Sequence, residues 1–460
     1  MRRRSFLRNL AWGGGSFLLL QHAPSAWTAQ ANEKLNIALI GVGGRGNWFV
    51  GTIPGLGENL VALCDVDETK NPSAYERLPK ARKFYDYRKM LDEMGQEIDA
   101  VIVAAPDHIH APAALRAMKL GKPVYCEKPL TNRVHEARLM RETAARCQVA
   151  TQMGNQGTAS EPFRRAVELI QAGTLGDIRE VHAWNDGGGP GPRPLPKGSP
   201  PVPAHFQWDL WLGPAAERAY HPDWVKGWHG WREFGTGNLG NWASHTLNLP
   251  FMALKLDTLW QKPAANASAT PDRAIRVQAE VSETSPDALP RWEIIHYDFP
   301  ARGPMPPVRV NWYNGSRGGF RQKIEDLMRR KLDWGDAGAK KWADFAGLLV
   351  VGSKGMLHTI AHNTSLTLLP EGQVKDADAV PRRLPRSPGH EREWLQACRG
   401  GPRAMSNFDY AGPLAEFVLL GNVATLFPEK LDFDPTGCRI VNHEKANLAL
   451  RRDYRKGWEI

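Results

Sequence analysis

The sequence is poor in cysteine and has no long apolar run. Its five cysteines in 460 residues are scattered and show no Cys-x-x-Cys spacing. We therefore expect no zinc site and no disulfide framework. Cys64 and Cys126 lie in apolar, strand-like runs, where cysteine usually behaves as a small hydrophobic residue. No stretch of about 18 consecutive apolar residues occurs, so we expect no membrane span.

The chain also lacks a strong excess of charge. The formal net charge is +10, and Arg2, Arg3, Arg4 and Arg8 supply four of these charges within residues 1–31, which contain no acid. The remaining +6 is spread over the rest of the chain, which argues against nucleic acid as a partner. The length and an apolar content of 42% are typical of a globular protein of two or three domains.

Residues 1–31 have the pattern of an export signal. A basic start precedes a short apolar stretch, and Ala29-Gln30-Ala31 fits a small-residue cleavage site. Arg3-Arg4-Ser5-Phe6-Leu7 resembles a twin-arginine signal, which exports proteins already folded. We therefore expect a periplasmic protein; the alternative is a disordered basic tail.

The region at 32–155 alternates strand-like and helix-like segments. Apolar runs that predict buried strands lie at 35–40, 59–64, 99–105, 123–127 and 149–153. Segments that predict helices lie between them, around 47–53, 87–94, 111–120 and 133–146. This alternation is typical of an α/β domain with a doubly wound parallel sheet, the Rossmann arrangement.

The character of the sequence changes after about residue 155. A predicted helix at 161–173 precedes strands in which apolar and polar residues alternate, as at 275–282 and 308–313. Such alternation predicts an antiparallel sheet with one buried face. We expect residues 156–460 to form a C-terminal α+β domain with a large, mostly antiparallel open sheet. Its polar outer face is either solvated or paired with a second subunit.

Two unusual segments interrupt this second region. Residues 186–203 are too rich in glycine and proline for regular structure and predict a long loop. The following residues, 205–234, are dense in tryptophan: Trp208, Trp211, Trp224, Trp228 and Trp231. These rings either pack in a core or form a surface on which the apolar faces of sugar rings stack.

A glycine-rich turn follows the first predicted strand and points to a dinucleotide. The turn contains Gly41, Gly43, Gly44, Arg45 and Gly46 and opens a predicted helix. Glycines at these positions allow a tight turn, close approach of a pyrophosphate and close helix packing. Asp65, at the end of the next strand, can bind the ribose diol and would repel a 2′-phosphate. NAD is therefore favoured, although Arg45 near the phosphates leaves NADP open, and the alternative is a glycine turn without a ligand.

Two further segments end at the same edge of the predicted sheet. Pro106 to His110 follows the strand at 99–105, and Glu127-Lys128-Pro129 follows the strand at 123–127. Ligands of open α/β sheets bind at this edge, so we expect Pro106, His110 and Glu127 to contact the cofactor. Pro129 favours an extended Lys128, whose amine would have a lowered pKa beside the cofactor and could act as an acid/base. The alternative for Lys128 is a structural salt bridge.

Together these motifs resemble the Gfo/Idh/MocA oxidoreductases, in particular an exported bacterial branch. The resemblance is carried by the segments APDHIHAP (105–112), GKPVYCEKPL (121–130), GNQGT (154–158), WDLWLGPA (208–215), GTGNLGNWASH (235–245) and YRKGWEI (454–460). It implies an NAD(P)-dependent enzyme for sugars, cyclitols or their derivatives, with Lys128 as the catalytic lysine. It also implies a dimer or tetramer formed through the open sheet.

The family's second catalytic pair is only half present. Members commonly carry an Asp and a His four residues apart in the second domain. The resemblance places His245 at the histidine, but Asn241 stands where the family has Asp. An amide can hold a substrate hydroxyl but cannot accept its proton, so proton transfer would fall to Lys128 or His245.

Three functions follow from these residues. The first is a sugar oxidoreductase that uses hydride transfer, with Lys128 as acid/base, His245 as proton partner and Asn241 as a positioning residue. The second is a redox-neutral glycosidase, lyase or epimerase that retains its NAD and oxidises the sugar only transiently. The third is a non-catalytic sugar-binding protein. In each case the expected partner is a small carbohydrate and no metal is expected.

Overall fold

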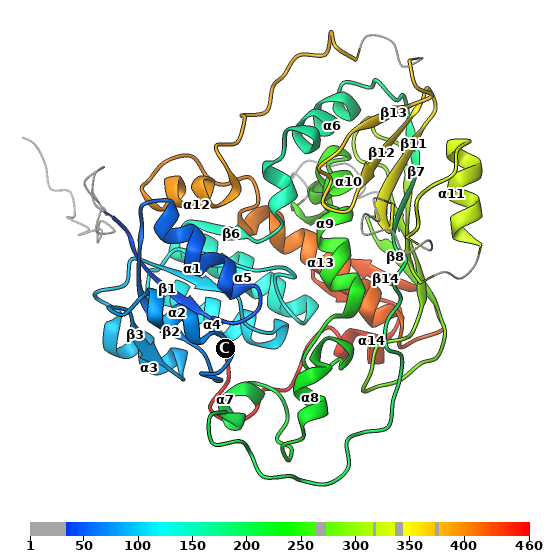
Figure 1. Cartoon of the computed structure of the whole chain (residues 1–460). Helices are drawn as coiled ribbons and strands as arrows, with labels where there is room; N and C mark the ends of the chain where they lie inside the picture. The colour runs from blue at the N-terminus through cyan, green and yellow to red at the C-terminus, as the bar shows by residue number, and fades with distance from the viewer. Residues whose placement is uncertain (1–33, 263–272, 316–318, 336–343, 373–376) are drawn as a thin grey trace, which may run out of the picture. The chain divides into compact units, whose positions relative to one another are not determined.

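The computed structural model describes residues 34–262, 273–315, 319–335, 344–372 and 377–460. The expected export signal at 1–31 lies outside this range. The described chain contains a six-stranded parallel sheet and a nine-stranded, mostly antiparallel sheet. Figure 1 shows the parallel sheet with its helices in blue and cyan, and the larger sheet in green and yellow except for its last two strands, which are orange-red.

The parallel sheet has the strand order β3-β2-β1-β4-β5-β6, which is that of a Rossmann fold. Its strands are β1 (Asn36–Ile40), β2 (Asn59–Cys64), β3 (Arg82–Phe84), β4 (Ala100–Val103), β5 (Val124–Cys126) and β6 (Thr151–Met153). The five predicted strands are confirmed. Strand β3 was not among them because its short Arg-Lys-Phe sequence is largely exposed and gives no apolar run.

The helices between these strands are α1 (Gly46–Gly55), α2 (Pro72–Arg77), α3 (Tyr87–Met94), α4 (Asp107–Lys119) and α5 (Val134–Cys147). Helix α4 begins four residues before the predicted start at 111. Asp107 lies in its first turn, where a carboxylate stabilises the helix dipole, and Pro112 is accommodated inside the helix. The segment Pro106 to His110 therefore contains the N-cap and the first turn of α4.

The second sheet has the order β13-β12-β11-β7-β10-β9-β8-β14-β15, in which only β7 and β10 pair in parallel. Its strands are β7 (Ile178–Asn185), β8 (Ile275–Val281), β9 (Glu293–Phe299), β10 (Val308–Asn314), β11 (Ala346–Gly352), β12 (Met356–Ile360), β13 (Thr367–Leu369), β14 (Leu431–Asp434) and β15 (Arg439–Ile440). The predicted antiparallel sheet is confirmed.

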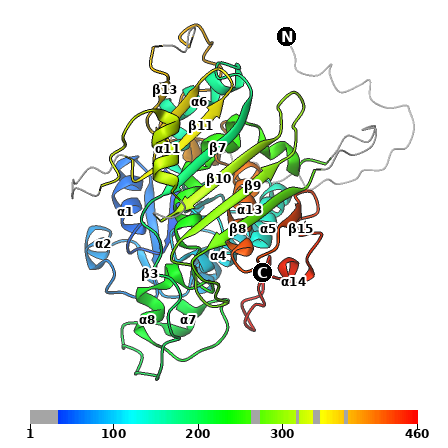
Figure 2. The same ribbon diagram turned by 90° about the vertical axis from the view of Figure 1, so that its right-hand side faces the viewer.

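Alternation along these strands separates two faces. Val310 and Trp312 belong to the inner core that the sheet shares with the Rossmann side, whereas Tyr313 belongs to a smaller outer cluster. Helix α11 (Phe320–Met328) covers part of the outer face, and Phe320 stacks on Tyr313 with ring centroids 5.0 Å apart. Figure 2 shows α11 lying across the sheet.

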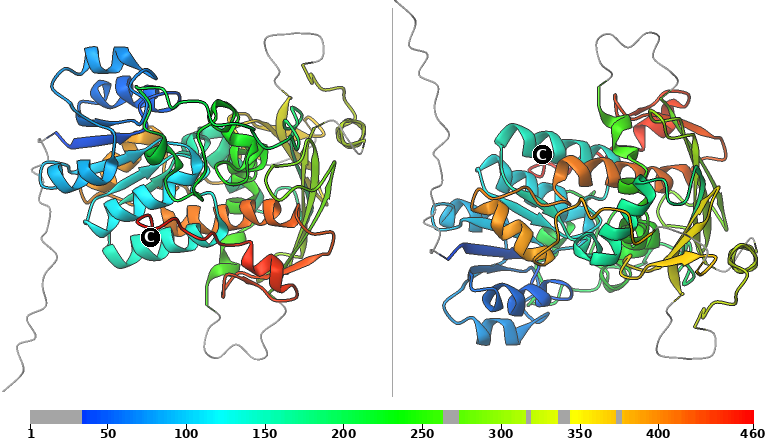
Figure 3. Two further views of the ribbon diagram at one scale, coloured as in Figure 1. Left: turned by 90° about the horizontal axis from the view of Figure 1, so that it is seen from below. Right: turned by 90° about the horizontal axis from the view of Figure 1, so that it is seen from above.

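Helix α13 (Phe408–Ala424) joins the two sheets. It contacts α5 and β6 on the Rossmann side and β8 of the larger sheet. The remaining helices of the second region are η1 (Gln156–Ala159), α6 (Glu161–Gln171), α7 (Trp208–Leu212), α8 (Pro222–Lys226), η2 (Trp228–Gly230), η3 (Leu239–Ala243), α9 (Ser244–Thr246), α10 (Asn248–Ala253), η4 (Leu256–Trp260), α12 (His390–Cys398) and α14 (Glu444–Leu448). Figure 3 shows α13 beside the larger sheet, on the side that faces the Rossmann helices.

Helix α12 returns from the second region to the Rossmann domain. Trp394 and Leu395 of α12 pack in the cluster that contains Phe49 and Tyr125. The rings of Tyr125 and Trp394 meet edge to face, with centroids 5.7 Å apart. A segment close to the end of the chain therefore completes the core of the first domain.

All five cysteines lie in the described part of the chain, and each is a free thiol. Within the same residues, the helices are too short or too polar to cross a membrane.

Candidate active site

The glycine-rich turn lies between β1 and α1 and leaves the start of the helix open. Gly41 has φ +84°, and a Cβ on Gly46 would lie 1.9 Å from the carbonyl oxygen of Gly41. Only glycine allows this approach of helix to turn. Among the described residues no side chain caps α1, and its first turn holds no acid. The helix N-terminus is thus free for an anionic group such as a pyrophosphate.

Asp65 holds the turn from the end of β2. Its carboxylate accepts hydrogen bonds from the backbone N–H groups of Val42 at 2.7 Å and Gly43 at 3.2 Å, and from that of Asp67 at 3.0 Å. Burial raises the pKa of Asp65. Each carboxylate oxygen has more than one acceptor site, so Asp65 can also receive ribose hydroxyls. Gly44, with no heavy atom within 4 Å of where its Cβ would lie, leaves the turn accessible.

The side chain of Arg45 pairs with Glu127. Its Nε is 2.7 Å from Oε1 of Glu127, and its guanidinium lies over the rings of Trp48 and Phe49. The part of the cavity where Asp65 is expected to bind the ribose is lined by the carboxylates of Asp65 and Asp67. This charge distribution favours NAD, because a 2′-phosphate would meet two negative groups.

Glu127 is enclosed at the end of β5. Its side chain is 4% exposed and also accepts a hydrogen bond from Nε2 of Gln156 at 3.2 Å. A Cβ on Gly154 would lie 2.6 Å from the Glu127 carboxyl group. Segment 154–158 therefore forms the wall behind this carboxylate.

Lys128 is half-buried and points toward the second domain. Its Nζ donates a hydrogen bond to Oδ1 of Asn241, and the peptide bond to Pro129 is cis. Burial lowers the pKa of Lys128, while Glu127 and Asp107 oppose this effect. Among the described residues its hydrogen-bond partner is an amide rather than a carboxylate, so a structural salt bridge does not account for this lysine.

The first turn of α4 ties three segments together. Asp107 accepts a hydrogen bond from Oγ1 of Thr236 at 2.6 Å, and the ring nitrogens of His110 lie 2.7 and 2.8 Å from the carbonyl oxygens of Pro129 and Ala105. Pro106 precedes this turn and, like His110, lines the central cavity. His110 thus connects the ends of β4 and β5 and fixes the loop that carries Lys128.

Asn241 and His245 come from one irregular stretch of helix. Asn241 lies in the π-helical turn η3, and His245 follows in α9. His245 is 5% exposed, and its Nδ1 has no hydrogen-bond partner among the described residues. Burial, followed by the charge of Lys128, lowers the pKa of His245 well below its usual value. The structure thus places a neutral imidazole close to Lys128.

A cavity of about 480 Å³ joins these elements. It is lined by the glycine turn, Asp65, Pro106, His110, Glu127 and Lys128. Asn241 and His245 are not among its lining residues, and Asn241 contacts the lining residue Lys128. The candidate cofactor residues and the lysine amine therefore face one space.

The tryptophan-rich segment covers this cavity. Trp211, Trp224 and Trp231 are buried. Trp211 also lines the cavity, together with Trp228 and His229. The segment is attached to the Rossmann domain through the backbone, because the N–H of Gln207 donates to the carbonyl of Val66 at 2.9 Å. Most of these rings are core, and two of the five, Trp211 and Trp228, line the cavity.

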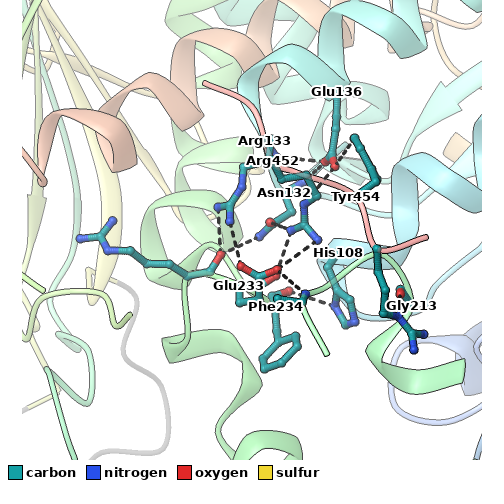
Figure 4. A network of polar contacts seen from close by, with 12 residues as sticks. His108, Asn132, Arg133, Glu136, Gly213, Glu233, Phe234, Arg452 and Tyr454 are labelled. Atoms are coloured by element: carbon teal, nitrogen blue, oxygen red, sulfur yellow. Dashed lines mark hydrogen bonds and ion pairs between the residues drawn. The ribbon is translucent and has the colours of Figure 1, made fainter. Parts of the chain in front are cut away.

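The end of the chain supports the two loops that carry the candidate catalytic residues. The guanidinium of Arg452 is 2% exposed and hydrogen-bonds to Asn132 and to the carbonyl of Glu233. Its Nε lies 3.4 Å from Oε1 of Glu136, which also accepts the Tyr454 hydroxyl at 2.9 Å. Figure 4 shows this network. Asn132 follows Lys128, and Glu233 precedes Asn241, so the network joins both loops.

Two residues near Lys128 were missed by the sequence analysis. Asp107 lines the cavity, and its position within the DHIH segment at a strand end could have identified it. His362, in the turn after β12, has its ring centroid 4.2 Å from that of His245. No local motif marks His362, because only the pairing of distant strands brings it there.

A model of an oxidoreductase family with an NAD-binding Rossmann fold, Gfo/Idh/MocA, matches residues 35–155. The matched residues are the Rossmann domain of this chain, which is therefore similar to the NAD-binding domain of that family. The open helix N-terminus, the ribose-side Asp65 and the shared cavity fit NAD.

Individual relatives resemble parts of the chain. It is 33% identical to an inositol 2-dehydrogenase of Rubrobacter xylanophilus over 34% of this chain and 44% of the relative. It is 32% identical to a glycosyl hydrolase family 109 protein of Stenotrophomonas maltophilia over 28% and 29% of the two chains. The alignments with these curated relatives thus span less than half of the relatives' length.

The whole fold has a counterpart among solved structures. The WlbA dehydrogenase of Chromobacterium violaceum, solved in complex with NADH and UDP-GlcNAcA, superimposes with a TM-score of 0.58. The match covers 88% of this chain and 97% of the other, at 17% identity. This likeness shows that both domains have the same fold in the two proteins.

Proposed function

We propose that this protein is an NAD-dependent oxidoreductase that acts on a sugar or a sugar derivative. The observation that carries the proposal is that the Lys128 amine and the glycine turn line one cavity. The relatives named inositol 2-dehydrogenase and the dehydrogenase solved with a nucleotide sugar support the substrate class.

The residues around Lys128 suit it to act as a base. Bound NAD⁺ would supply the hydride acceptor for the carbon that is oxidised. Lys128 would take the proton of the reacting hydroxyl at Nζ, which requires a neutral amine. Burial lowers the pKa of this amine, and its partner Asn241 carries no charge to stabilise the ammonium form. Asn241 can then orient a substrate oxygen through its amide N–H group.

A direct test is to incubate the purified protein with NAD⁺ and a panel that includes myo-inositol, N-acetylglucosamine and methyl glucosides. We expect NADH, measured by its absorbance, in proportion to an oxidised sugar identified by mass spectrometry. No change in any sugar under these conditions, together with a Lys128→Met variant that binds the same sugars equally well, would support the sugar-binding alternative instead.

The substitution Asn241→Asp tests why this position is an amide. A carboxylate beside Lys128 stabilises the ammonium form and raises the pKa of Lys128, by about one to three pH units for a close opposite charge. Activity rises with pH as the lysine loses its proton, so the acid limb of the pH profile of kcat should move to higher pH. An unchanged limb would show that Asn241 does not set the protonation of Lys128.

A second candidate is a redox-neutral reaction in which NAD stays bound and the sugar is only transiently oxidised. The tryptophan-rich segment favours it, because it covers the cavity and is attached to the strand-end residue Val66. The glycosyl hydrolase family 109 relative is consistent with this chemistry. Nicotinamide that survives dialysis and is released by denaturation, with altered sugar but no net NADH, would distinguish this reaction from ordinary dehydrogenation.

We also propose export and self-association. The twin-arginine pattern at Arg3-Arg4 supports export of the folded protein to the periplasm, where retention of NAD would be needed. The outer face of the large sheet carries ion pairs such as Asp298–Arg309 and Glu180–Lys323 beside α11. This polar face supports a dimer or tetramer formed through the sheet.

A further inference from the structure

His362 lies beside the candidate catalytic residues although it comes from a distant part of the chain. Its ring meets the ring of His245 edge to face, with centroids 4.2 Å apart, and stacks on Trp242 with centroids 5.7 Å apart. Trp242 directly follows Asn241, whose side chain contacts Lys128. The His362 side chain is solvent-accessible, whereas His245 is buried.

The turn that carries His362 is fixed on two sides. The side chain of Asn363 donates to the carbonyl of His245 at 2.6 Å, and the hydroxyl of Ser160 donates to the carbonyl of Asn363 at 3.1 Å. On the other side, a Cβ on Gly157 would lie 1.8 Å from the carbonyl oxygen of His362. The backbone at His362 is therefore held by the 154–158 segment and by the helix that carries His245.

This arrangement leaves polar nitrogen atoms unused. The Nδ1 atom of His245 is buried and has no partner among the described residues. A buried polar atom without a partner costs about 1–3 kcal/mol, so such atoms are usually satisfied by a ligand or an ordered water. Within the described chain, no hydrogen bond from the His362 ring accompanies its contacts with His245 and Trp242. Two neighbouring imidazoles thus offer their nitrogens to a ligand near Lys128.

We propose that His362 is a further substrate-binding residue, which together with His245 recognises the hydroxyl group next to the one oxidised at Lys128. The proposal rests on the proposed sugar oxidoreductase function and narrows its substrate class to sugars and cyclitols with a vicinal diol. The reacting hydroxyl lies at the Lys128 amine, and the neighbouring hydroxyl donates to, or accepts from, the imidazole pair. Position 241 carries an amide in place of the family's carboxylate. The two imidazoles supply the hydrogen-bond acceptors that this carboxylate would provide.

The test compares probes that differ in one hydroxyl group. We expect the NAD⁺-loaded wild-type protein to oxidise myo-inositol or methyl α-D-glucopyranoside at least about 10²-fold more efficiently, in kcat/KM, than monodeoxy analogues that lack a neighbouring hydroxyl. A site built to hydrogen-bond a hydroxyl rejects an analogue without it by that factor or more. The His362→Phe variant keeps a ring for Trp242 to stack on. In this variant the preference for the diol probe over its deoxy analogue, measured by kcat/KM, should fall to a few-fold.

A second measurement does not depend on turnover. In ¹⁵N-histidine spectra of the NAD⁺-loaded protein, the diol probe should shift the ring signals of His362 and His245, and the deoxy analogue should not. His135→Phe, on the outer part of α5, is the matched control and should keep both the preference and the shifts.

The outcomes separate the two hypotheses. Oxidation of the diol probe with an unchanged preference in His362→Phe overturns the role of His362 alone. Shifted histidine signals with no NADH and no change in the sugar overturn the oxidoreductase function alone. If no diol probe is turned over and none shifts the histidine signals, the proposed recognition of vicinal diols is wrong.

Discussion

Replacing Lys128 by Met should lower kcat by about 10³-fold, in the middle of the range for loss of a general acid–base group. Methionine has a similar length and keeps the apolar part of the side chain but removes the amine that contacts Asn241. The glycine turn, Asp65 and Glu127 are unchanged, so NAD binding should be retained. Turnover of the active sugar and NAD affinity, measured on the same preparation, test the two halves of this expectation.

The matched control is Lys119→Met, at the exposed end of α4 in the same domain. It removes one positive charge without touching the cavity and should keep full activity. A Lys128→Met protein with wild-type turnover would show that the amine is not the acid/base, and the oxidoreductase mechanism proposed for this site would then be wrong. An equal loss in both variants would point to the general charge of the domain.

The position of Lys128 could be predicted because its signals are local. A buried strand followed by Glu-Lys-Pro can be recognised from a few consecutive residues. Ligands of parallel sheets bind at the edge where such strands end. The glycine turn and Asp65 were predicted for the same reason, since their spacing reflects one β-α-β unit. The structure adds what Asp65 does before any ligand binds, namely hold the turn through the backbone of Val42 and Gly43.

The remaining parts of the site depend on contacts between distant segments. Arg45 was expected near the phosphates from its place in the glycine turn, and its pairing with Glu127 at the end of another strand could not be predicted. His362 reaches His245 only because β11 pairs with both β7 and β12. The pairing and register of these strands depend on the whole sheet, so they cannot be predicted from the periodicity of one segment. The same limit explains why helix α12, far along the chain, was not expected in the Rossmann core.

The buried Arg452 network makes the second large prediction. Replacing Arg452 by Met should lower the free energy of unfolding by about 3–5 kcal/mol, because it leaves charged partners buried without their cation. The Glu136 side chain is 1% exposed and would keep the Tyr454 hydroxyl and backbone N–H groups as partners but lose the guanidinium. Arg133 lies nearby and is partly buried, and desolvation together with the charge of Arg452 lowers its pKa to about 10.

Urea denaturation of the full chain measures this loss, with Arg451→Met as the control. Arg451 is the preceding residue and is exposed, so its replacement should change the stability by less than about 0.5 kcal/mol. Arg452→Lys should lie between the two, since an ammonium keeps the charge but cannot span Asn132 and Glu233 as the planar guanidinium does. Equal stability of Arg451→Met and Arg452→Met would mean that the buried charges are compensated elsewhere. Because Asn132 and Glu233 flank the loops of Lys128 and Asn241, a real loss at Arg452 should also lower kcat while the protein is still folded.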